Sequence, residues 1–185
     1  MKQPRLILFT DIGDTIIDEG TEIRDAEGTV VHADCIPGAC QTYLRIREAG
    51  FPVVMVADGT VQSFANTMRE NGLDSVFAAR IISEAVGEEK PSARMFEAAM
   101  ASLGLTEEDK GRILMIGNNV ARDIAGANRF GIRSVLLTWS TRRSFEPFSP
   151  DEIPTYRIAK PEELIPLLAR LEEEYDTETH ENSPT

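Results

Sequence analysis

Five short, almost continuous apolar runs divide the first 140 residues of the chain. Runs of this length, rich in β-branched residues, are typical of strands that are buried on both faces of a parallel sheet. The five predicted strands are Leu6–Thr10, Val53–Ala57, Ala79–Ser83, Ile113–Ile116 and Ser134–Thr138.

Between the runs, apolar residues recur every three or four positions, which predicts helices. Four such helices end at a glycine, the residue that most easily adopts the left-handed conformation after a last turn. They cover residues 38–49, 63–71, 92–103 and 120–130. A last helix is predicted over 162–174, with Pro166 confining its regular part to the later turns. The alternation of strands and helices predicts an α/β fold with a doubly wound parallel sheet.

One stretch breaks this alternation directly after the first predicted strand. Thr21–Arg24 and Thr29–His32 flank the turn sequence Asp-Ala-Glu-Gly, which predicts a β-hairpin with a four-residue loop within residues 16–36. Because no internal repeat or linker interrupts the rest, residues 1–171 are expected to form one core that carries this hairpin as a flap. Residues 172–185 are expected to be an acidic tail, most simply a frayed and solvated end.

The charge of the chain excludes several classes of function. It carries 31 acidic and 19 basic residues, a formal net charge of −12, and the tail contains acidic residues without any lysine or arginine. Such a surface repels phosphate backbones and anionic lipid, so we expect neither nucleic acid nor membrane as a partner. No apolar run is long enough for a membrane span and no signal peptide is evident, which favours a cytoplasmic protein. The oligomeric state stays open.

The cysteines and histidines restrict the available chemistry. Cys35 and Cys40 do not have the CxxC spacing, and reduced, partly buried thiols are favoured over a disulfide. Of the two histidines, His32 and His180, the second lies in the tail, so a Ser-His-Asp or Cys-His mechanism has little to use. Catalysis would therefore depend on carboxylates, a lysine, backbone amides or a metal.

Polar residues gather where the predicted strands end. Asp11 follows the first strand and Asp58 the second, while Asn118 and Asp123 follow the fourth. Lys90 stands just before the third helix. Because ligands of open α/β sheets bind outside the carboxyl ends of the strands, we expect these side chains to share one edge. Such a cluster is suited to holding a hard cation through oxygen atoms and a phosphate through amides and an ammonium group.

At these positions the sequence resembles the haloacid dehalogenase (HAD) superfamily of hydrolases. The four motifs resemble, in order, LILFTDIGDT, VVMVADGT, the Lys90 segment EEKPSARMFEAAMASLGL and ILMIGNNVARDIAGANRFGI. The segment IPTYRIAKPEELIPLL is similar to the usual ending of the superfamily, so the resemblance covers about residues 5–170. It implies a Rossmann-like core and a Mg²⁺-dependent phosphohydrolase that acts on a phosphorylated substrate.

The resemblance also implies roles for individual residues. Asp11 matches the nucleophile that forms an aspartyl-phosphate, and Lys90 matches the lysine that pairs with the phosphate and the nucleophile. The residues implied to hold Mg²⁺ are Asp11, Gly13 through its backbone carbonyl, Asn118 and Asp123. The residues implied to bind the phosphate of the substrate are Ile12, Ala57, Asp58 and Gly59.

Three positions depart from the motifs. Gly13 stands where phosphatases of the superfamily usually carry an aspartate as general acid and base; Asp14, one place later, is explained at least as well as a turn residue. Ala57 replaces a serine or threonine, and Asn118 replaces an aspartate. Loss of a positioned acid typically costs about 10²–10⁴-fold in rate. A catalytically attenuated relative with a binding or regulatory role is therefore the alternative.

The spacing of the motifs leaves no room for a folded cap domain after the first or the second motif, so the site is expected to be open. Arg142 and Arg143 follow the fifth strand and could meet an anionic substrate, although a solvated loop pair is the simpler interpretation. A phosphoacceptor receiver domain, with Asp58 as acceptor, is a further alternative. It would need a lysine at the end of a strand, whereas Lys110 precedes the fourth one.

Overall fold

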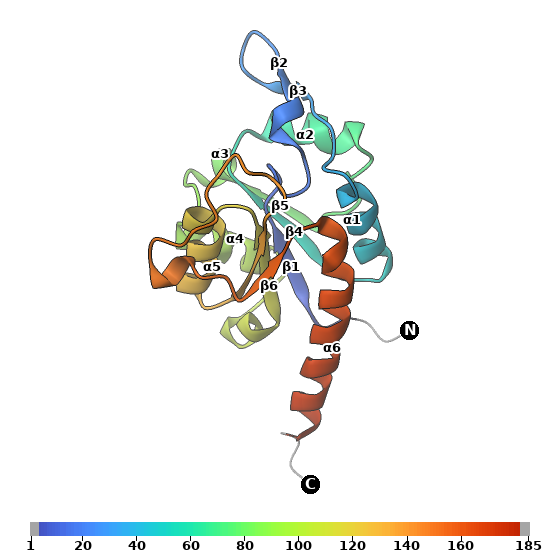
Figure 1. Cartoon of the computed structure of the whole chain (residues 1–185), viewed down its shortest axis with the longest axis vertical. Helices are drawn as coiled ribbons and strands as arrows, with labels where there is room; N and C mark the ends of the chain where they lie inside the picture. Colours follow the sequence, from blue (N-terminus) through green and yellow to red (C-terminus); the bar gives the residue numbers. More distant parts are fainter. Residues whose placement is uncertain (1–3, 182–185) are drawn as a thin grey trace.

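The computed structural model describes residues 4–181, which are built around a sheet of six parallel strands (Figure 1). The strands lie in the order β5-β4-β1-β6-β7-β8. Their bounds are β1 Ile7–Thr10, β4 Val53–Ala57, β5 Ala79–Ile82, β6 Ile113–Gly117, β7 Arg133–Leu137 and β8 Tyr156–Ile158. The doubly wound α/β fold and its five predicted strands are confirmed. The sixth strand, β8, was not predicted because its three edge residues do not form an apolar run.

The central position of β1 determines where a site can form. Thr10, its last residue, pairs in register with Met55 of β4 on one side and Ile116 of β6 on the other. The chain builds the sheet outward from β1 to β5, then returns past β1 to add β6, β7 and β8. The carboxyl ends of β1, β4 and β6 therefore flank the point where the strand order reverses, which is where open α/β sheets bind ligands.

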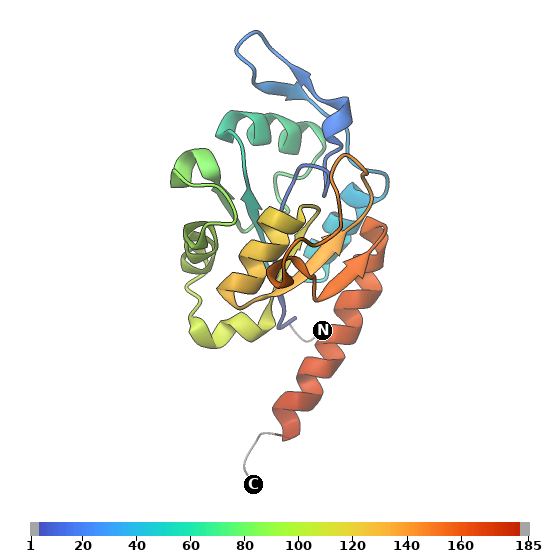
Figure 2. The ribbon, with the colours of Figure 1, turned by 60° about the vertical axis from the view of Figure 1, so that its left-hand side comes forward.

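Helices cover both faces of the sheet (Figure 2). On one face, Leu8 and Met55 pack with α1, α2 and α6, and on the other, Phe9 and Met115 pack with α4 and α5. The bounds of these helices are α1 Ala39–Glu48, α2 Val61–Glu70, α4 Ala93–Ser102, α5 Ala125–Phe130 and α6 Leu164–Glu181. Shorter turns are η1 Glu19–Thr21, α3 Ser83–Val86, η2 Glu107–Arg112, η3 Val120–Ile124, η4 Pro150–Glu152 and η5 Pro161–Glu163. Within residues 4–181, no helix combines the length and apolar character that a membrane span requires.

Two predicted helices differ in detail. The segment after β6 begins as the π-helical turn η3, whose first N–H groups are accepted by the Asn119 side chain, and continues as α5. Helix α6 accommodates Pro166 in its first turn, where a missing N–H costs nothing, and runs on to Glu181 instead of fraying at Glu172. The Glu172 carboxylate accepts the N–H groups of Arg5 and Leu6 at 2.9 and 2.7 Å, so α6 is fixed to the start of β1.

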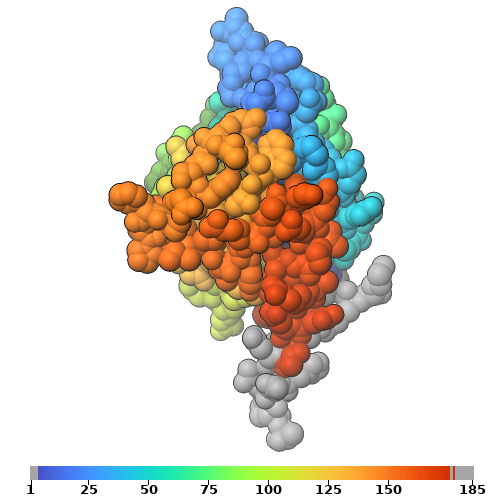
Figure 3. All heavy atoms as spheres, viewed as in Figure 1, coloured from blue at the N-terminus to red at the C-terminus, as the bar shows by residue number. Residues whose placement is uncertain are grey.

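The predicted hairpin is present and forms the flap. Its strands, β2 Ile23–Arg24 and β3 Val30–His32, are shorter than predicted, and they project at the top of Figures 1 and 3. The flap rests on α2, because Val30 donates its N–H to Ser63 Oγ at 3.0 Å and accepts Asn66 Nδ2 at 2.9 Å. No full cap domain stands between the motifs, as expected.

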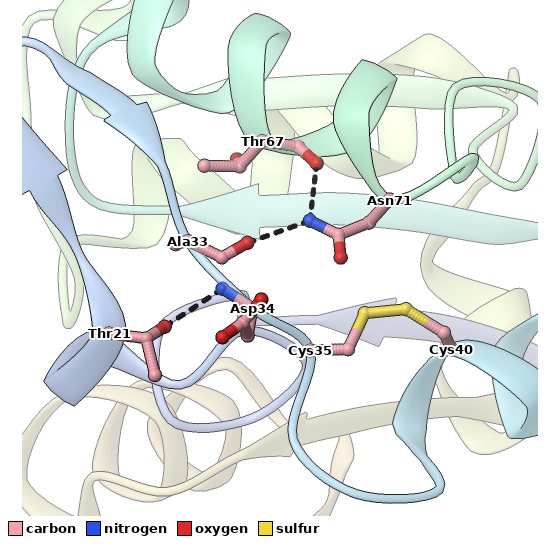
Figure 4. The surroundings of a disulfide bond; sticks show 7 residues. All are labelled: Thr21, Ala33, Asp34, Cys35, Cys40, Thr67 and Asn71. Atoms are coloured by element: carbon pink, nitrogen blue, oxygen red, sulfur yellow. Dashed lines mark hydrogen bonds between the residues drawn. A yellow bond between two sulfur atoms is a disulfide. The ribbon is translucent and has the colours of Figure 1, made fainter.

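The prediction of reduced thiols is wrong, because Cys35 and Cys40 form a disulfide (Figure 4). The spacing of the two cysteines did not indicate the disulfide. It forms because the turn before α1 brings their Cα atoms to within 6.1 Å of each other. Beside the disulfide, Asn71 at the end of α2 donates to the Ala33 carbonyl at 2.8 Å. The base of the flap is thus attached to α1 by a covalent bond and to α2 by hydrogen bonds.

Reduction of this disulfide is expected to lower the free energy of unfolding by about 2 kcal/mol, since it closes only a short loop. Urea denaturation with and without a reductant measures the difference. A Cys35→Ser/Cys40→Ser variant should resemble the reduced protein and should not respond to the reductant. An unchanged midpoint on reduction would show that the cross-link contributes nothing to stability.

Candidate active site

A pocket of about 150 Å³ opens between the carboxyl ends of the strands and the flap. It brings together eight of the nine predicted site residues, which are Asp11, Ile12, Gly13, Asp58, Gly59, Lys90, Asn118 and Asp123. Ala57, at the end of β4, is fully buried and does not line the pocket. Four charged lining residues were not predicted from the motifs: Glu19, Glu22, Arg24 and Arg122.

Lys90 is the centre of the charge network. Its Nζ lies 2.7 Å from Asp11 Oδ1 and 2.8 Å from the Val56 carbonyl, and both contacts are hydrogen bonds. It also lies 2.7 Å from Asp123 Oδ1, an ion pair without hydrogen-bond geometry. The lysine side chain is only 1% exposed, so water contributes little to the solvation of its charge.

Burial and neighbouring charges shift the acidities in this network. Burial raises the pKa of Asp11, and the attraction of Lys90 opposes this increase while the repulsion of Asp123 adds to it, so the result lies above the usual range. Burial lowers the pKa of Lys90, but Asp11, Asp123 and Asp58 together raise it further, so the lysine stays charged. Two carboxylates around one ammonium leave one negative charge uncompensated, which a bound cation would neutralise.

Asp58 holds the backbone of Lys90 in place. Its Oδ1 accepts the backbone N–H of Lys90 at 2.9 Å, and its Oδ2 pairs with the Arg122 guanidinium at 3.1 Å. The N–H of Gly59, which was predicted to face the phosphate, donates instead to Ser83 Oγ at 2.9 Å. The second motif therefore secures the lysine loop as well as lining the pocket.

Several residues that line the pocket carry oxygen atoms of the kind that Mg²⁺ binds. The described residues include no cluster of three or more Asp, Glu, His or Cys side chains that could hold a metal. Asp11, Gly13 and Asn118 nevertheless line one pocket and offer a carboxylate, a carbonyl and an amide oxygen. Mg²⁺ commonly uses one or two carboxylates and completes its shell with water and substrate phosphate, so this donor set suits it.

Asp123 can approach the end of β6 because residue 117 is a glycine and leaves room for its carboxylate. A Cβ atom on Gly117, the last residue of β6, would lie 2.3 Å from the carboxyl carbon of Asp123. Asp123 Oδ2 accepts the Asn119 N–H at 3.0 Å, and Oδ1 faces Lys90. Its position at the strand end was predicted, and its pairing with the lysine was not.

Asp14 does not take the place of the missing aspartate. It is fully buried with a φ of 49°, and it does not line the pocket. Its Oδ1 accepts Arg142 at 2.8 Å and the Glu19 N–H at 3.1 Å, so it is a turn residue that organises the start of the flap. Arg142 also pairs with Asp18, so this arginine lies in an exposed loop as predicted but is held there by two carboxylates.

Glu19 occupies the space that Gly13 leaves free. A Cβ atom built on Gly13 would lie 2.1 Å from Glu19 Oε1. Burial, reinforced by the nearby Asp14 carboxylate, raises the pKa of Glu19. Arg143 approaches the same carboxylate at 3.7 Å and also lines the pocket. The absence of a side chain at Gly13 was the one sequence signal, but it did not indicate which residue fills the space.

Comparison with known proteins agrees with the fold. Residues 5–131 match the family model of haloacid dehalogenase-like hydrolases. The chain belongs to this family.

Relatives of known activity include several phosphatases. The chain is 30% identical over 135 residues to a glyceraldehyde 3-phosphate phosphatase of Methanopyrus kandleri, covering 73% of this chain and 57% of that protein. It is 27% identical over 119 residues to a phosphoserine phosphatase of Thermus thermophilus, covering 64% and 45%. The chain thus spans about half the length of these relatives.

Solved structures share the fold. The HAD-hydrolase YfnB from Bacillus subtilis, determined with magnesium bound, superposes with a TM-score of 0.71 at 20% identity, covering 90% of this chain and 99% of that one. A HAD phosphatase from Thermococcus onnurineus gives a TM-score of 0.71 at 16% identity, covering 88% and 97%.

Proposed function

We propose that the chain is a Mg²⁺-dependent phosphohydrolase that acts through an aspartyl-phosphate on Asp11. The observation that carries this proposal is the 2.7 Å contact of Lys90 Nζ with Asp11 Oδ1 in a pocket at the end of β1. The lysine orients the carboxylate and offers positive charge to the incoming phosphate. The phosphatase activity of the relatives supports the same reaction class.

In the first half of the proposed reaction, a carboxylate oxygen of Asp11 attacks phosphorus, and the bond from phosphorus to the leaving oxygen breaks. In the second half, water attacks the same phosphorus, the bond to Asp11 breaks, and inorganic phosphate leaves. Lys90 stays bound to the Asp11 carboxylate and balances charge on the phosphoryl oxygens in both halves.

Asp11, the Gly13 carbonyl and Asn118 are the proposed Mg²⁺ ligands, with Asp123 behind them. The ion would neutralise the phosphate and so reduce the repulsion that an anionic nucleophile meets. Asp123 Oδ2 accepts the Asn119 N–H, whereas the buried Oδ1 has an ion pair with Lys90 but no hydrogen bond, so this residue would contribute to the site through Oδ1, directly or through water.

The substrate is proposed to be a phosphate ester that enters without the enclosure of a cap. Arg24 and Arg143 line the pocket together with Glu19 and Glu22, so the group attached to the phosphate would meet both signs of charge. The alternative of an attenuated, phosphate-binding relative is distinguished by turnover itself. The first assay therefore uses an aryl phosphate and acetyl phosphate, each with Mg²⁺ and with a chelator. Turnover that disappears with the chelator supports the proposal, and equal rates in both conditions contradict it.

Mg²⁺ is also expected to stabilise the fold. At 100 times its dissociation constant, a ligand that binds only the native state contributes about 2.7 kcal/mol. Thermal unfolding should shift upward with Mg²⁺ in the wild type and far less in Asn118→Ala, which removes a neutral ligand. A variant at Glu27, on the exposed flap turn, serves as control and should respond as the wild type does. Equal shifts in wild type and Asn118→Ala would contradict the assigned ligand.

A further inference from the structure

An alkyl phosphate cannot leave readily as an alkoxide, so the proposed reaction needs a proton donor near the leaving oxygen. Five carboxyl groups line the pocket and are candidates for this role. They are Asp11, Glu19, Glu22, Asp58 and Asp123. Asp11 is the nucleophile and cannot also be the donor.

Three of the other four are already engaged. Asp58 uses both oxygens for the lysine loop and its arginine, and Asp123 uses both for Lys90 and a backbone N–H. Glu22 pairs closely with Arg24 on the flap. Their carboxyl groups are therefore fixed by protein contacts.

Glu19 is different. Among the described residues, no hydrogen bond reaches its carboxyl group, and its nearest cation, Arg143, lies 3.7 Å away. The carboxyl group lies against Gly13, two residues after the nucleophile, at the place where a side chain of residue 13 would begin. The backbone of Glu19 is held there, because its N–H donates to the buried Asp14.

Resting on the proposed phosphohydrolase activity, we infer that Glu19 is the general acid and base of this site and supplies from the flap the carboxyl group that Gly13 lacks. As the bond from phosphorus to the leaving oxygen breaks, that oxygen keeps the electron pair and takes the proton of the Glu19 carboxylic acid. The resulting carboxylate then accepts a proton from the water that attacks phosphorus and releases Asp11. Glu19 ends protonated and ready for another cycle.

The test compares Glu19→Gln with the wild type on two phosphate esters. For an alkyl phosphate, the variant is expected to lose about 10²–10⁴-fold in kcat/KM. For 4-nitrophenyl phosphate, whose phenol leaves without protonation, the loss should be much smaller in the first half of the reaction. The second half still lacks its base, so phosphorylated protein should accumulate and be visible by mass spectrometry. Glu27→Gln removes the same charge from the exposed flap turn. This control should neither lose kcat/KM nor accumulate phosphorylated protein.

Two further variants test the placement of the carboxyl group. Gly13→Ala puts a methyl group where Glu19 Oε1 lies, and because a glutamate end can swing aside, its Tm should stay near that of the wild type. Its turnover of alkyl phosphates should nevertheless fall as in Glu19→Gln. Gly13→Asp/Glu19→Ala restores a carboxyl group from the other residue and should recover at least about tenfold over Glu19→Ala.

The outcomes separate the two proposals. If the wild type shows no Mg²⁺-dependent turnover, the phosphohydrolase proposal fails. If the wild type is active, but Glu19→Gln loses the same factor in kcat/KM on both esters and no phosphorylated protein accumulates, the proposed role of Glu19 is overturned. The phosphohydrolase proposal is not affected by that result. A double variant as inactive as Glu19→Ala would also count against the placement.

Discussion

Asp11→Asn is expected to lower kcat/KM for 4-nitrophenyl phosphate by at least about 10⁴-fold, because an amide oxygen does not displace a phosphate leaving group under these conditions. Asparagine has the same shape, so the hydrogen bond from Lys90 keeps an acceptor. Burial already disfavours the charged form of Asp11, so the variant should be no less stable than the wild type.

Steady-state kinetics and mass spectrometry of the phosphorylated protein check this expectation together. The wild type, quenched in acid during turnover, should carry a phosphoryl group within the peptide that contains Asp11, and the variant should carry none. A phosphorylated Asp58 with an unmodified Asp11 would instead favour the receiver-like alternative. Activity in Asp11→Asn equal to that of the wild type would contradict the assigned nucleophile.

Lys90→Met is expected to reduce both activity and stability. Its ammonium group is the buried partner of Asp11 and Asp123, and breaking such a pair costs about 3–5 kcal/mol. For a chain of this length, that corresponds to a decrease in Tm of about 10 °C. Lys160→Met, at an exposed lysine, is the matched control and should change Tm little.

The loss in Lys90→Met should depend on pH with a defined sign. Without the lysine, nothing opposes the burial that raises the pKa of Asp11 above its value in the unfolded chain, so the native state of the variant binds more protons. Its stability relative to the wild type should therefore recover as the pH falls and worsen as it rises. Thermal unfolding at pH 5 and pH 8 measures this. A deficit that is equal at both values would mean that lost packing, not charge, explains the effect.

The sheet and most of the site could be predicted because they depend on local patterns. Apolar runs such as Val53–Ala57 are fully buried strands, and Asp11, Asp58 and Asn118 follow strands whose ends meet at one edge. Strand β8 escaped prediction because its pairing with β7 depends on tertiary position and not on its own composition.

The features missed by sequence reasoning depend on how the irregular segment between β1 and α1 turns. The Cys35–Cys40 disulfide, the pairing of Asp14 with Arg142 and the position of Glu19 all follow from that path. Neither residue type nor spacing determines such a path. Gly13 in place of the usual aspartate was interpreted as a sign of weakened catalysis. In the structure, the carboxylate of Glu19 lies in the space that a side chain of residue 13 would occupy.

The attachment of the flap has a consequence for substrate selection. A disulfide to α1 and hydrogen bonds to α2 fix the base of the flap. The part of the pocket wall that the flap supplies is therefore already formed before a substrate binds. Binding then incurs little ordering entropy, and the width of the entrance acts as a fixed sieve. Compounds should be discriminated by the size and charge of the group next to the phosphate, with association rates limited by encounter and not by a closing motion.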